Sequence, residues 1–440
     1  MNLKILYILC LLVLSKFIIR NSLAFTPSSD VGISAVLMNS TIYYIADVTQ
    51  TISNSFLKKK TISKPFKTSD SSLPWVNLTQ LSQTLPPCSF TTATLVDNRI
   101  FLIGGLYGND NFNKSNLIFY VFDTKKQTWN QTLTINPPAN RISASSIYNP
   151  KTGKIYVFGG RFNSSTTTTT SDANSANYPL DMNILNPTNY QWSKGSSLNA
   201  PAGRDDQAVV LLPSGLILYI GGRTPNNGGY INPSMTELYA YDTNTDTWTT
   251  KNTKGYNPTP RGSAQAVLTD DGRVIVYGGV NGGASNLLGL PVDDDLVVLD
   301  IGDFSWSQPS ISTTPPPLSR YQIVTLVGYY LIVAFGQIMS GGTGISTSNV
   351  YVLDARNKSD YKWITNFDPK IAITPLQSNT TVSQTSTPIS SGNSEKANIG
   401  LIIGVIIGAI ILIALGSTFI WYRYFRLKNV IPTYGDNKEI

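Results

Sequence analysis

The chain has 440 residues, of which 41% are hydrophobic and only 13% are charged, with a formal net charge of +7 and no histidine. An average globular protein is about 25% charged, which argues against a large solvated helical surface. The one basic cluster away from the chain ends, Lys58–Lys60 with Lys64 and Lys67, lacks interleaved aromatic residues, so no nucleic-acid partner is expected. Val, Ile, Tyr, Thr and Phe alternate between Gly, Pro, Asn and Asp turns, which favours an all-β fold.

Residues 1–24 resemble a secretory signal peptide. Lys4 supplies a positive start, residues 5–14 are apolar, and residues 22–24 (Ser-Leu-Ala) form a small-x-small cleavage site. The alternative is an uncleaved anchor, although the apolar run is short for a bilayer. Cys10 leaves with the signal, so Cys88 has no internal disulfide partner and is expected to be a small buried hydrophobic residue; intermolecular pairing is the alternative.

Six similar units follow, each with a hydrophobic run before a tight turn and a lone tryptophan that ends the unit. The runs are residues 42–45, 101–105, 156–160, 218–222, 275–279 and 332–336, and the tryptophans are Trp75, Trp129, Trp192, Trp248, Trp306 and Trp363. A regular period in this range indicates a repeat architecture.

The fourth unit shows the strand pattern most clearly. Residues 207–212 predict a first strand, the turn 213–215 leads to a second strand over 216–220, and Gly221-Gly222 follows. After a long loop, residues 237–242 predict a third strand and 247–249 a fourth. Four short antiparallel strands per unit form one blade of a β-propeller, in which the tryptophan is expected to pack between adjacent blades.

Several in-phase positions resemble the kelch repeat of the galactose-oxidase-like propellers over residues 30–365. They are the arginines before the first strands (Arg141, Arg204, Arg261 and Arg320), the diglycines, the aromatic or aliphatic residue with aspartate on the third strands (as in Tyr241-Asp242) and the spaced tryptophans. The first and last units depart from the diglycine, with Ala46-Asp47 and Gly336-Gln337 in its place. The resemblance implies six blades over residues 25–370, and the stem after them is too short for a seventh.

The absence of histidine removes the copper ligands that the resemblance implies for an oxidase, together with Ser-His-Asp and Cys-His systems. We therefore expect no enzyme activity and no cofactor. Adjacent carboxylates such as Asp205-Asp206 and Asp270-Asp271 are expected to point to opposite faces or to serve as turn residues rather than to bind calcium.

The arginines before the first strands are expected at the mouth of the propeller, either recognising an anionic or carbonyl-bearing partner or pairing with neighbouring groups. Loops 223–236, 280–294 and 337–349 are predicted to form a protein-binding sector because no glycosylation sequon falls within them. The candidate partner-binding residues are Arg204, Arg223, Tyr230, Arg261, Arg320 and Gln337. Tyrosine and arginine are the residue types that commonly anchor interfaces.

Seven asparagines begin Asn-x-Ser/Thr sequons and are predicted to be N-glycosylated: Asn39, Asn77, Asn113, Asn130, Asn163, Asn357 and Asn379. Residues 371–397 are rich in Ser, Thr and Pro and predict an extended stalk.

Residues 398–422 predict one transmembrane helix, followed by a cytoplasmic tail over 423–440 that begins with Arg423, Arg426 and Lys428. Gly400, Gly404 and Gly408 repeat at four-residue spacing, which suits a homodimer through close helix approach; ordinary tolerance of glycine in lipid is the alternative.

Together these patterns predict a single-pass type I glycoprotein of the plasma membrane with an extracellular kelch propeller. Its expected function is non-catalytic protein binding in adhesion, sensing or scaffolding. The alternatives are a carbohydrate-active enzyme and a lectin-like module that binds cell-surface glycans on aromatic platforms such as Tyr107 and Tyr230.

Overall fold

The computed structural model describes residues 31–45, 57–69, 73, 75–78, 81, 85–86, 88–107, 117–162, 177–226, 229–282, 289–340 and 343–372. The predicted signal peptide, transmembrane helix and tail lie outside these residues, as do Asn113, Asn163, Asn379, Gly400, Gly404 and Gly408. Within the described ranges no helix is long and apolar enough to cross a membrane. All described residues belong to one compact unit, which ends at Gln377.

Six antiparallel sheets follow one another along this unit, and each is built on four consecutive main strands. Blade one comprises β1 (Ser34–Met38), β2 (Thr41–Ile45), β3 (Leu57–Thr61) and β5 (Trp75–Asn77). Blade two comprises β7 (Thr92–Val96), β8 (Arg99–Ile103), β10 (Phe119–Asp123) and β11 (Thr128–Gln131). Blade three comprises β12 (Ile142–Asn149), β13 (Lys154–Arg161), β14 (Met182–Asn186) and β15 (Gln191–Lys194). Blade four comprises β16 (Ala208–Leu211), β17 (Leu216–Ile220), β20 (Glu237–Asp242) and β21 (Thr247–Asn252). Blade five comprises β23 (Gln265–Leu268), β24 (Arg273–Tyr277), β27 (Leu296–Asp300) and β28 (Ser305–Ser307). Blade six comprises β31 (Ile323–Val327), β32 (Tyr330–Ala334), β35 (Val350–Asp354) and β36 (Asp360–Ile364). The prediction of an all-β propeller is confirmed for this part of the chain.

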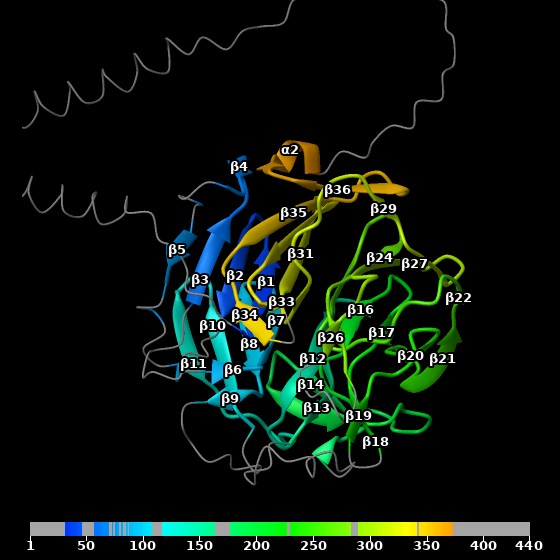
Figure 1. Ribbon diagram of the computed structural model, residues 1–440. Helices are drawn as coiled ribbons and strands as arrows, with labels where there is room; N and C mark the ends of the chain where they lie inside the picture. Colours follow the sequence, from blue (N-terminus) through cyan, green and yellow to red (C-terminus); the bar gives the residue numbers. More distant parts are fainter. Residues whose placement is uncertain are drawn as a thin grey trace, which may run out of the picture. The chain divides into compact units, whose positions relative to one another are not determined.

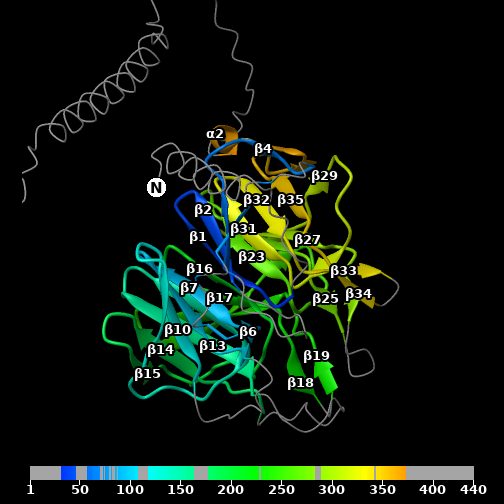
Figure 2. The ribbon, with the colours of Figure 1, turned by 90° about the vertical axis from the view of Figure 1, so that its left-hand side faces the viewer.

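The blades form a closed ring. The first strands contact one another in the order β1, β7, β12, β16, β23 and β31, and β31 contacts β1 again. Both ribbon views show the blue strands of blade one beside the yellow strands of blade six (Figures 1 and 2). The parallel outer strands β22 (Lys254–Gly255) and β29 (Ser310–Ile311) extend blades five and six. The described residues therefore form six blades and contain no seventh.

Each outer-strand tryptophan packs against the preceding blade, as predicted. The ring of Trp248 lies 4.7 Å from that of Phe158 in blade three, and Trp363 lies 5.3 Å from Tyr277 in blade five. Trp75 of blade one lies 5.6 Å from Phe335 of blade six, so the same contact closes the ring. Aromatic burial at every seam supplies a large share of the hydrophobic stabilisation.

The diglycines allow neighbouring backbones to approach closely. The Gly160 N–H donates to the Arg204 carbonyl at 2.8 Å, and the Gly222 N–H donates to the Arg261 carbonyl at 2.9 Å. A Cβ atom at Gly221 would lie 2.3 Å from the Arg261 carbonyl oxygen, and its φ of +65° also favours glycine. Each diglycine therefore joins its blade to the next.

Blade six places the diglycine positions one residue earlier than the sequence suggested. Phe335 (φ 62°) and Gly336 (φ 85°) adopt the two left-handed conformations, rather than Gly336 and Gln337. Tertiary contacts hold Phe335 in this conformation: its N–H donates to Asn349, and its ring packs 5.1 Å from Tyr44.

The last described segment also closes the ring. β37 (Asn366–Phe367) pairs with β4 (Phe66–Lys67), and the rings of Phe66 and Phe367 stack at 4.7 Å. The short helix α2 (Pro369–Ala372) follows, and its Ala372 carbonyl accepts a hydrogen bond from the Tyr329 N–H at 2.8 Å. No main strand is exchanged between blades one and six, so side-chain packing and this short segment hold that seam.

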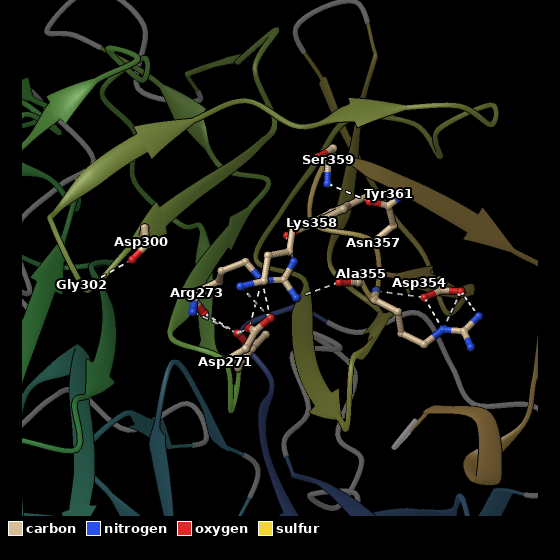
Figure 3. Close-up of polar contacts among 12 residues, drawn as sticks. Asp271, Arg273, Asp300, Gly302, Asp354, Ala355, Asn357, Lys358, Ser359 and Tyr361 are labelled. Atoms are coloured by element: carbon tan, nitrogen blue, oxygen red, sulfur yellow. Dashed lines mark hydrogen bonds and ion pairs between the residues drawn. The ribbon is translucent and has the colours of Figure 1, made fainter. Parts of the chain in front are cut away.

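An arginine at the start of β24 ties blade five to blade six at the edge where the first strands end (Figure 3). Arg273 Nε lies 3.0 Å from Asp271 Oδ1, and its Nη2 donates to the Ala355 carbonyl at 2.9 Å. Its Nη1 donates to the Tyr361 hydroxyl. Asp270-Asp271-Gly272 is a turn, as predicted, and Asp271 in addition anchors this link.

We predict that Trp248→Ala lowers the free energy of unfolding by about 3–5 kcal/mol, because the cavity would lie in the seam between blades three and four. Urea unfolding of the full chain followed by tyrosine fluorescence measures the change. Val76→Ala is the control, since Val76 is 42% exposed on an outer strand and should change stability little. Equal effects of the two substitutions would contradict the wedge role of the tryptophan.

Candidate functional site

One face of the propeller carries all segments that follow the second strands. In each antiparallel blade the first strand begins where the second ends, so these segments gather around the start of the first strands. We call this the mouth face; its described segments are 106–107, 117–118, 161–162, 177–181, 223–226, 229–236, 280–282, 289–295, 337–340 and 343–349. Three hairpins stand on it: β18 (Thr224–Asn226) with β19 (Gly229–Ile231), β25 (Val280–Asn281) with β26 (Leu290–Pro291), and β33 (Gln337–Ser340) with β34 (Thr343–Ser346).

A ring of left-handed residues, one from each blade, surrounds the axis just before the first strands. The ring consists of Gly32, Phe90, Ser143, Asp206, Ser263 and Tyr321, with φ values between 51° and 70°. The N–H of each member from Phe90 to Tyr321 donates to the carbonyl of the preceding member, at distances of 2.9 to 3.2 Å. Ser143, Asp206 and Ser263 each lie two residues after a repeat arginine, and their left-handed conformation is accompanied by the hydrogen bond to the preceding blade.

The axis holds a cavity of about 210 Å³ that all six blades line. Phe90 and Tyr321 narrow it at the mouth face, where their rings meet edge to face at 5.6 Å. The Tyr321 hydroxyl donates to Asp206 Oδ2 at 3.3 Å, and the Ser263 hydroxyl donates to the same oxygen at 3.1 Å. The cavity is smaller than the ~300–1,000 Å³ pockets that bind drug-sized ligands.

Two arginines and two aspartates form an ionic cluster beside this opening. Arg223 Nη2 lies 2.9 Å from Asp205 Oδ2 and 2.8 Å from Asp206 Oδ2, and Arg161 Nε of blade three lies 3.0 Å from Asp205 Oδ2. The expectation that Asp205 and Asp206 diverge is wrong, because the left-handed Asp206 (φ 54°) turns both carboxylates toward Arg223. The Tyr230 ring centroid lies 5.6 Å from the Arg223 guanidinium carbon, so two predicted binding residues meet here.

The side chains of Arg161 and Arg223 remain 29% and 22% exposed, whereas Asp205 is fully buried. The carboxylate of Asp205 raises the pKa of Arg161 against the opposing effect of burial, while burial raises the pKa of Asp205 itself against the opposing effect of the two arginines. Residue spacing gave no sign of Arg161 as part of a site, since its partner lies in the next blade.

Three of the arginines before the first strands are buried and bind neighbouring groups of the fold. Arg141 Nη1 pairs with Asp181 Oδ1 at 2.8 Å, and Arg261 Nη2 pairs with Asp294 Oδ1 at 2.6 Å. Arg204 is 4% exposed, lies over the Tyr239 ring at 5.1 Å and donates from Nε to the Ala202 carbonyl; burial lowers its pKa to about 10. The structure therefore favours pairing with neighbouring groups for Arg204 and Arg261.

Arg320 is out of phase with the other three arginines. Ser319 occupies their position, because its carbonyl accepts the Gly279 N–H at 2.9 Å. Arg320 is 7% exposed, and its Nε donates to Gln337 Oε1 at 3.1 Å. The predicted candidates Arg320 and Gln337 thus meet within blade six, and the expected series of four equivalent arginines is wrong at its last member.

The exposed aliphatic side chains of the mouth face were not predicted individually. Ile231, Leu290 and Ile345 stand on the three hairpins with exposures of 44%, 57% and 59%, and Leu180 of blade three is 46% exposed. The described turns that join first to second and third to fourth strands carry no large exposed hydrophobic residue. Larger exposures occur at Leu133 (94%) and Leu198 (74%) in segments that follow fourth strands, and Ile371 of α2 is 43% exposed near the turn at Tyr329, so the three hairpins are one of several places of apolar exposure.

The structure also places the predicted glycosylation sites, the predicted aromatic platform and the cysteine. The described sequon asparagines Asn39, Asn77, Asn130 and Asn357 are exposed, and none lies on the mouth face. Tyr107 is 6% exposed and stacks on Tyr120, which contradicts its role as an aromatic platform. Cys88 is a buried cysteine, as expected. Within the described ranges no group of three or more His, Cys, Asp or Glu residues could hold a metal ion.

Asp295 lies below the β25–β26 hairpin and is 8% exposed. Burial raises its pKa to about 6, and the neighbouring Asp294 adds to this effect while Arg261 opposes it. Its carboxylate is thus protonated in the folded state over a pH range where an unfolded aspartate is ionised.

We predict that Asp205→Asn destabilises the fold by about 3–5 kcal/mol, because two guanidinium groups lose the buried carboxylate that compensates them. Thermal unfolding of the full chain measures the loss. Asp270→Asn is the control, since Asp270 is exposed in a turn and should be almost neutral. A loss below about 1 kcal/mol for Asp205→Asn would show that Asp206 alone suffices.

We also predict a pH-dependent effect of Asp295→Asn. Because the folded pKa of Asp295 is about 6, above the ordinary value of 3.8, its contribution to stability is present at low pH and is lost as pH rises through 6. The variant should match the wild type near pH 3 and exceed its free energy of unfolding by about 3 kcal/mol at pH 7.5. Asp293→Asn at an exposed neighbour is the control, and a difference that does not grow between these pH values contradicts the assignment.

Comparison with known proteins agrees with this geometry. The family model described as the KLHDC2/KLHL20/DRC7 Kelch-repeats domain matches residues 90–281 and, in a second overlapping match, 153–383. The solved structure of YjhT has the same fold, with a TM-score of 0.58 and 14% identity over 77% of this chain and 98% of that chain.

Two curated relatives match at lower coverage of their own length. Acyl-CoA-binding domain-containing protein 4 of Arabidopsis thaliana is 22% identical over 272 residues, which are 59% of this chain and 36% of that protein. The Rab9 effector protein with kelch motifs of Bos taurus is 24% identical over 220 residues, 48% of this chain and 53% of that protein. The chain thus spans about a third to a half of these relatives. With the family model covering more than half of its residues, the chain belongs to the kelch-repeat family.

Proposed function

We propose that this chain is a non-catalytic kelch protein of the cell surface that binds a protein partner on its mouth face. Kelch-repeat domains generally mediate protein interactions, and the bovine relative is by name an effector protein. The observation that carries the proposal is the set of exposed aliphatic side chains on three adjacent blades, Ile231, Leu290 and Ile345. They fall in the three loops for which the sequence predicted a binding sector.

The chemistry of the mouth face supports docking of a protein surface. Its apolar side chains stand on hairpins around the partly exposed Arg223 and Tyr230, a combination of residue types that anchors interfaces. Arg204 and Arg261 lie beneath them and hold the loops, so they act on the partner only through the shape of the face. Adhesion, sensing and scaffolding all fit such a face.

The proposed location rests on the sequence. The apolar, uncharged segment near the C-terminus, the basic residues that follow it and the N-terminal signal pattern support a type I orientation. The exposure of Asn39, Asn77, Asn130 and Asn357 is compatible with glycans, and all four leave the mouth hairpins uncovered. Under this proposal the mouth face is available to a partner outside the cell.

We predict that photo-crosslinking residues placed at Ile231, Leu290 and Ile345 of the full chain on intact cells capture one common protein. Crosslinkers at Asp270, Gly302 and Lys358 serve as matched controls on the opposite face. Ile231→Asp with Leu290→Asp should abolish capture by the crosslinker at Ile345 while leaving surface biotinylation of the chain unchanged, because the apolar contact is replaced by charge. Capture by the control positions alone would overturn the assignment of the face, and chains inaccessible to biotin would overturn the location.

A further inference from the structure

The face opposite the mouth carries charges of both signs on separate blades. It is formed by the turns that join first to second and third to fourth strands. In blades two and three, these turns and the strand residues that flank them hold five basic and two acidic side chains, whereas in blades four and five they hold one basic and six acidic side chains. We call these regions the basic lobe (Arg99, Lys125, Lys126, Lys151 and Lys154 with Asp97 and Asp123) and the acidic lobe (Asp242, Asp246, Asp270, Asp271, Asp300 and Asp303 with Arg273).

The four lysines of the basic lobe, two on each blade, make no ion pair within the described part of the chain. Lys125 and Lys126 of blade two are exposed. On blade three, Lys151 donates from Nζ to the Pro213 carbonyl, which leaves its charge without a counterion, and Lys154 is half-buried at the start of β13. The lobe therefore retains positive charge that the fold does not compensate.

The acidic lobe likewise holds two aspartates on each blade without an ion pair to any described residue. They are Asp242 and Asp246 of blade four and Asp270 and Asp300 of blade five. Asp303 differs from them because it pairs with Lys254 at 3.0 Å. Asp271 pairs with Arg273 and with Lys358 (Figure 3). Negative charge therefore remains on both blades of the acidic lobe.

The order of the blades in the ring makes the two lobes complementary in a pair of identical chains. A twofold axis that lies in the plane of this face and points between blades three and four brings blade two of one copy onto blade five of the other, and blade three onto blade four. Lys125 and Lys126 then face Asp270 and Asp300 of the second copy. In the same way Lys151 and Lys154 face the two aspartates of blade four, and each contact occurs twice.

We propose that the basic lobe of one chain docks on the acidic lobe of a second copy in a twofold-symmetric dimer. The described turns of both lobes carry no large exposed hydrophobic residue, so charge holds the two copies together. Exposed ion pairs are individually weak and are screened by salt, so the dimer is weak and sensitive to ionic strength. Asn39 and Asn357, the described sequons in the turns of this face, lie on blades one and six and thus outside both lobes.

This surface lies opposite the mouth face, so the proposal does not depend on partner docking at the three hairpins. The crosslinker at Asp270 should capture a second copy of this chain, whereas those at Ile231, Leu290 and Ile345 should not. Ile231→Asp, which alters the mouth face, should leave the dimer unchanged.

Sedimentation velocity of the purified full chain in a neutral detergent tests the proposal with two charge-reversed variants. Lys125→Asp with Lys126→Asp makes the turn of blade two acidic, and Asp270→Lys with Asp300→Lys makes the turns of blade five basic. Each variant alone brings like charges together at two contacts, so its dimer dissociation constant should rise about tenfold. An equimolar mixture of the two variants restores opposite charges at both contacts and should form heterodimers whose dissociation constant lies within about threefold of the wild-type value.

The matched control is Glu237→Lys with Asp293→Lys. Both residues are exposed on the mouth side, and the pair changes the net charge by as much as the blade-five variant does. Its dimer should dissociate as the wild-type dimer does, and thermal unfolding checks that every variant folds. Raising the salt concentration from about 50 to about 500 mM should weaken the wild-type dimer about tenfold.

Monomers at protein concentrations up to about 0.5 mM would overturn the proposal. So would a dimer that both charge-reversed variants retain, which would place the contact elsewhere in the chain. A mixture that stays monomeric would show that the lobes attract a molecule other than a second copy. Equal weakening in the control would assign the effect to net charge and overturn the role of the lobes.

Discussion

One backbone hydrogen bond, repeated from blade to blade, determines most of this structure. The N–H at the second glycine position donates to the carbonyl just before the first strand of the next blade, as from Gly160 to Arg204 and from Gly222 to Arg261. The bond brings two backbones so close that a side chain at Gly159 or Gly221 would collide with the acceptor. It thereby fixes where each first strand begins and how the blades turn about the axis.

The roles of the arginines follow from this constraint. A residue whose carbonyl accepts that bond has its side chain enclosed between blades, so Arg141, Arg204 and Arg261 are buried and brace the loops above them. Residues directly after the diglycine lie farther out, which leaves Arg161 and Arg223 partly exposed at the opening. The same repeat thus gives buried arginines before the first strands and partly exposed arginines after the diglycines. Only the arginines after the diglycines can contact a partner directly.

The fold was largely predictable because its signals are local. Residues 216–220 and 237–242 were predicted as strands with the bounds that the structure shows, since alternation and turn residues lie within a few positions of each strand. The tryptophans fixed the number of blades for the same reason. Blade six was misaligned by one residue, because a nonglycine residue, Phe335, takes a left-handed conformation that packing against Trp75 and Tyr44 maintains.

The site was predictable only in outline. The loops of blades four to six were named as a binding sector with Arg223 and Tyr230 among the candidates; the two side chains lie close together, and their role in binding stays a prediction. The convergence of Asp205 and Asp206 on Arg223 could not be foreseen, because it depends on the φ of Asp206, which the ring of hydrogen bonds between blades sets. Tyr107 was misjudged for a similar reason: its burial against Tyr120 is a property of the folded blade.

The sequence by itself determined the repeat, the strands within each blade, the buried tryptophans and the loops that could carry a binding face. These features depend on residues close together in the chain, because hydrophobic alternation and turn preferences are local and do not require contacts with distant residues. Only the tertiary structure decided that Arg161 reaches Asp205 across 44 positions and that Tyr321 reaches Asp206 across 115. Contacts between residues so far apart in the sequence exist because the ring closes, and ring closure requires all six blades.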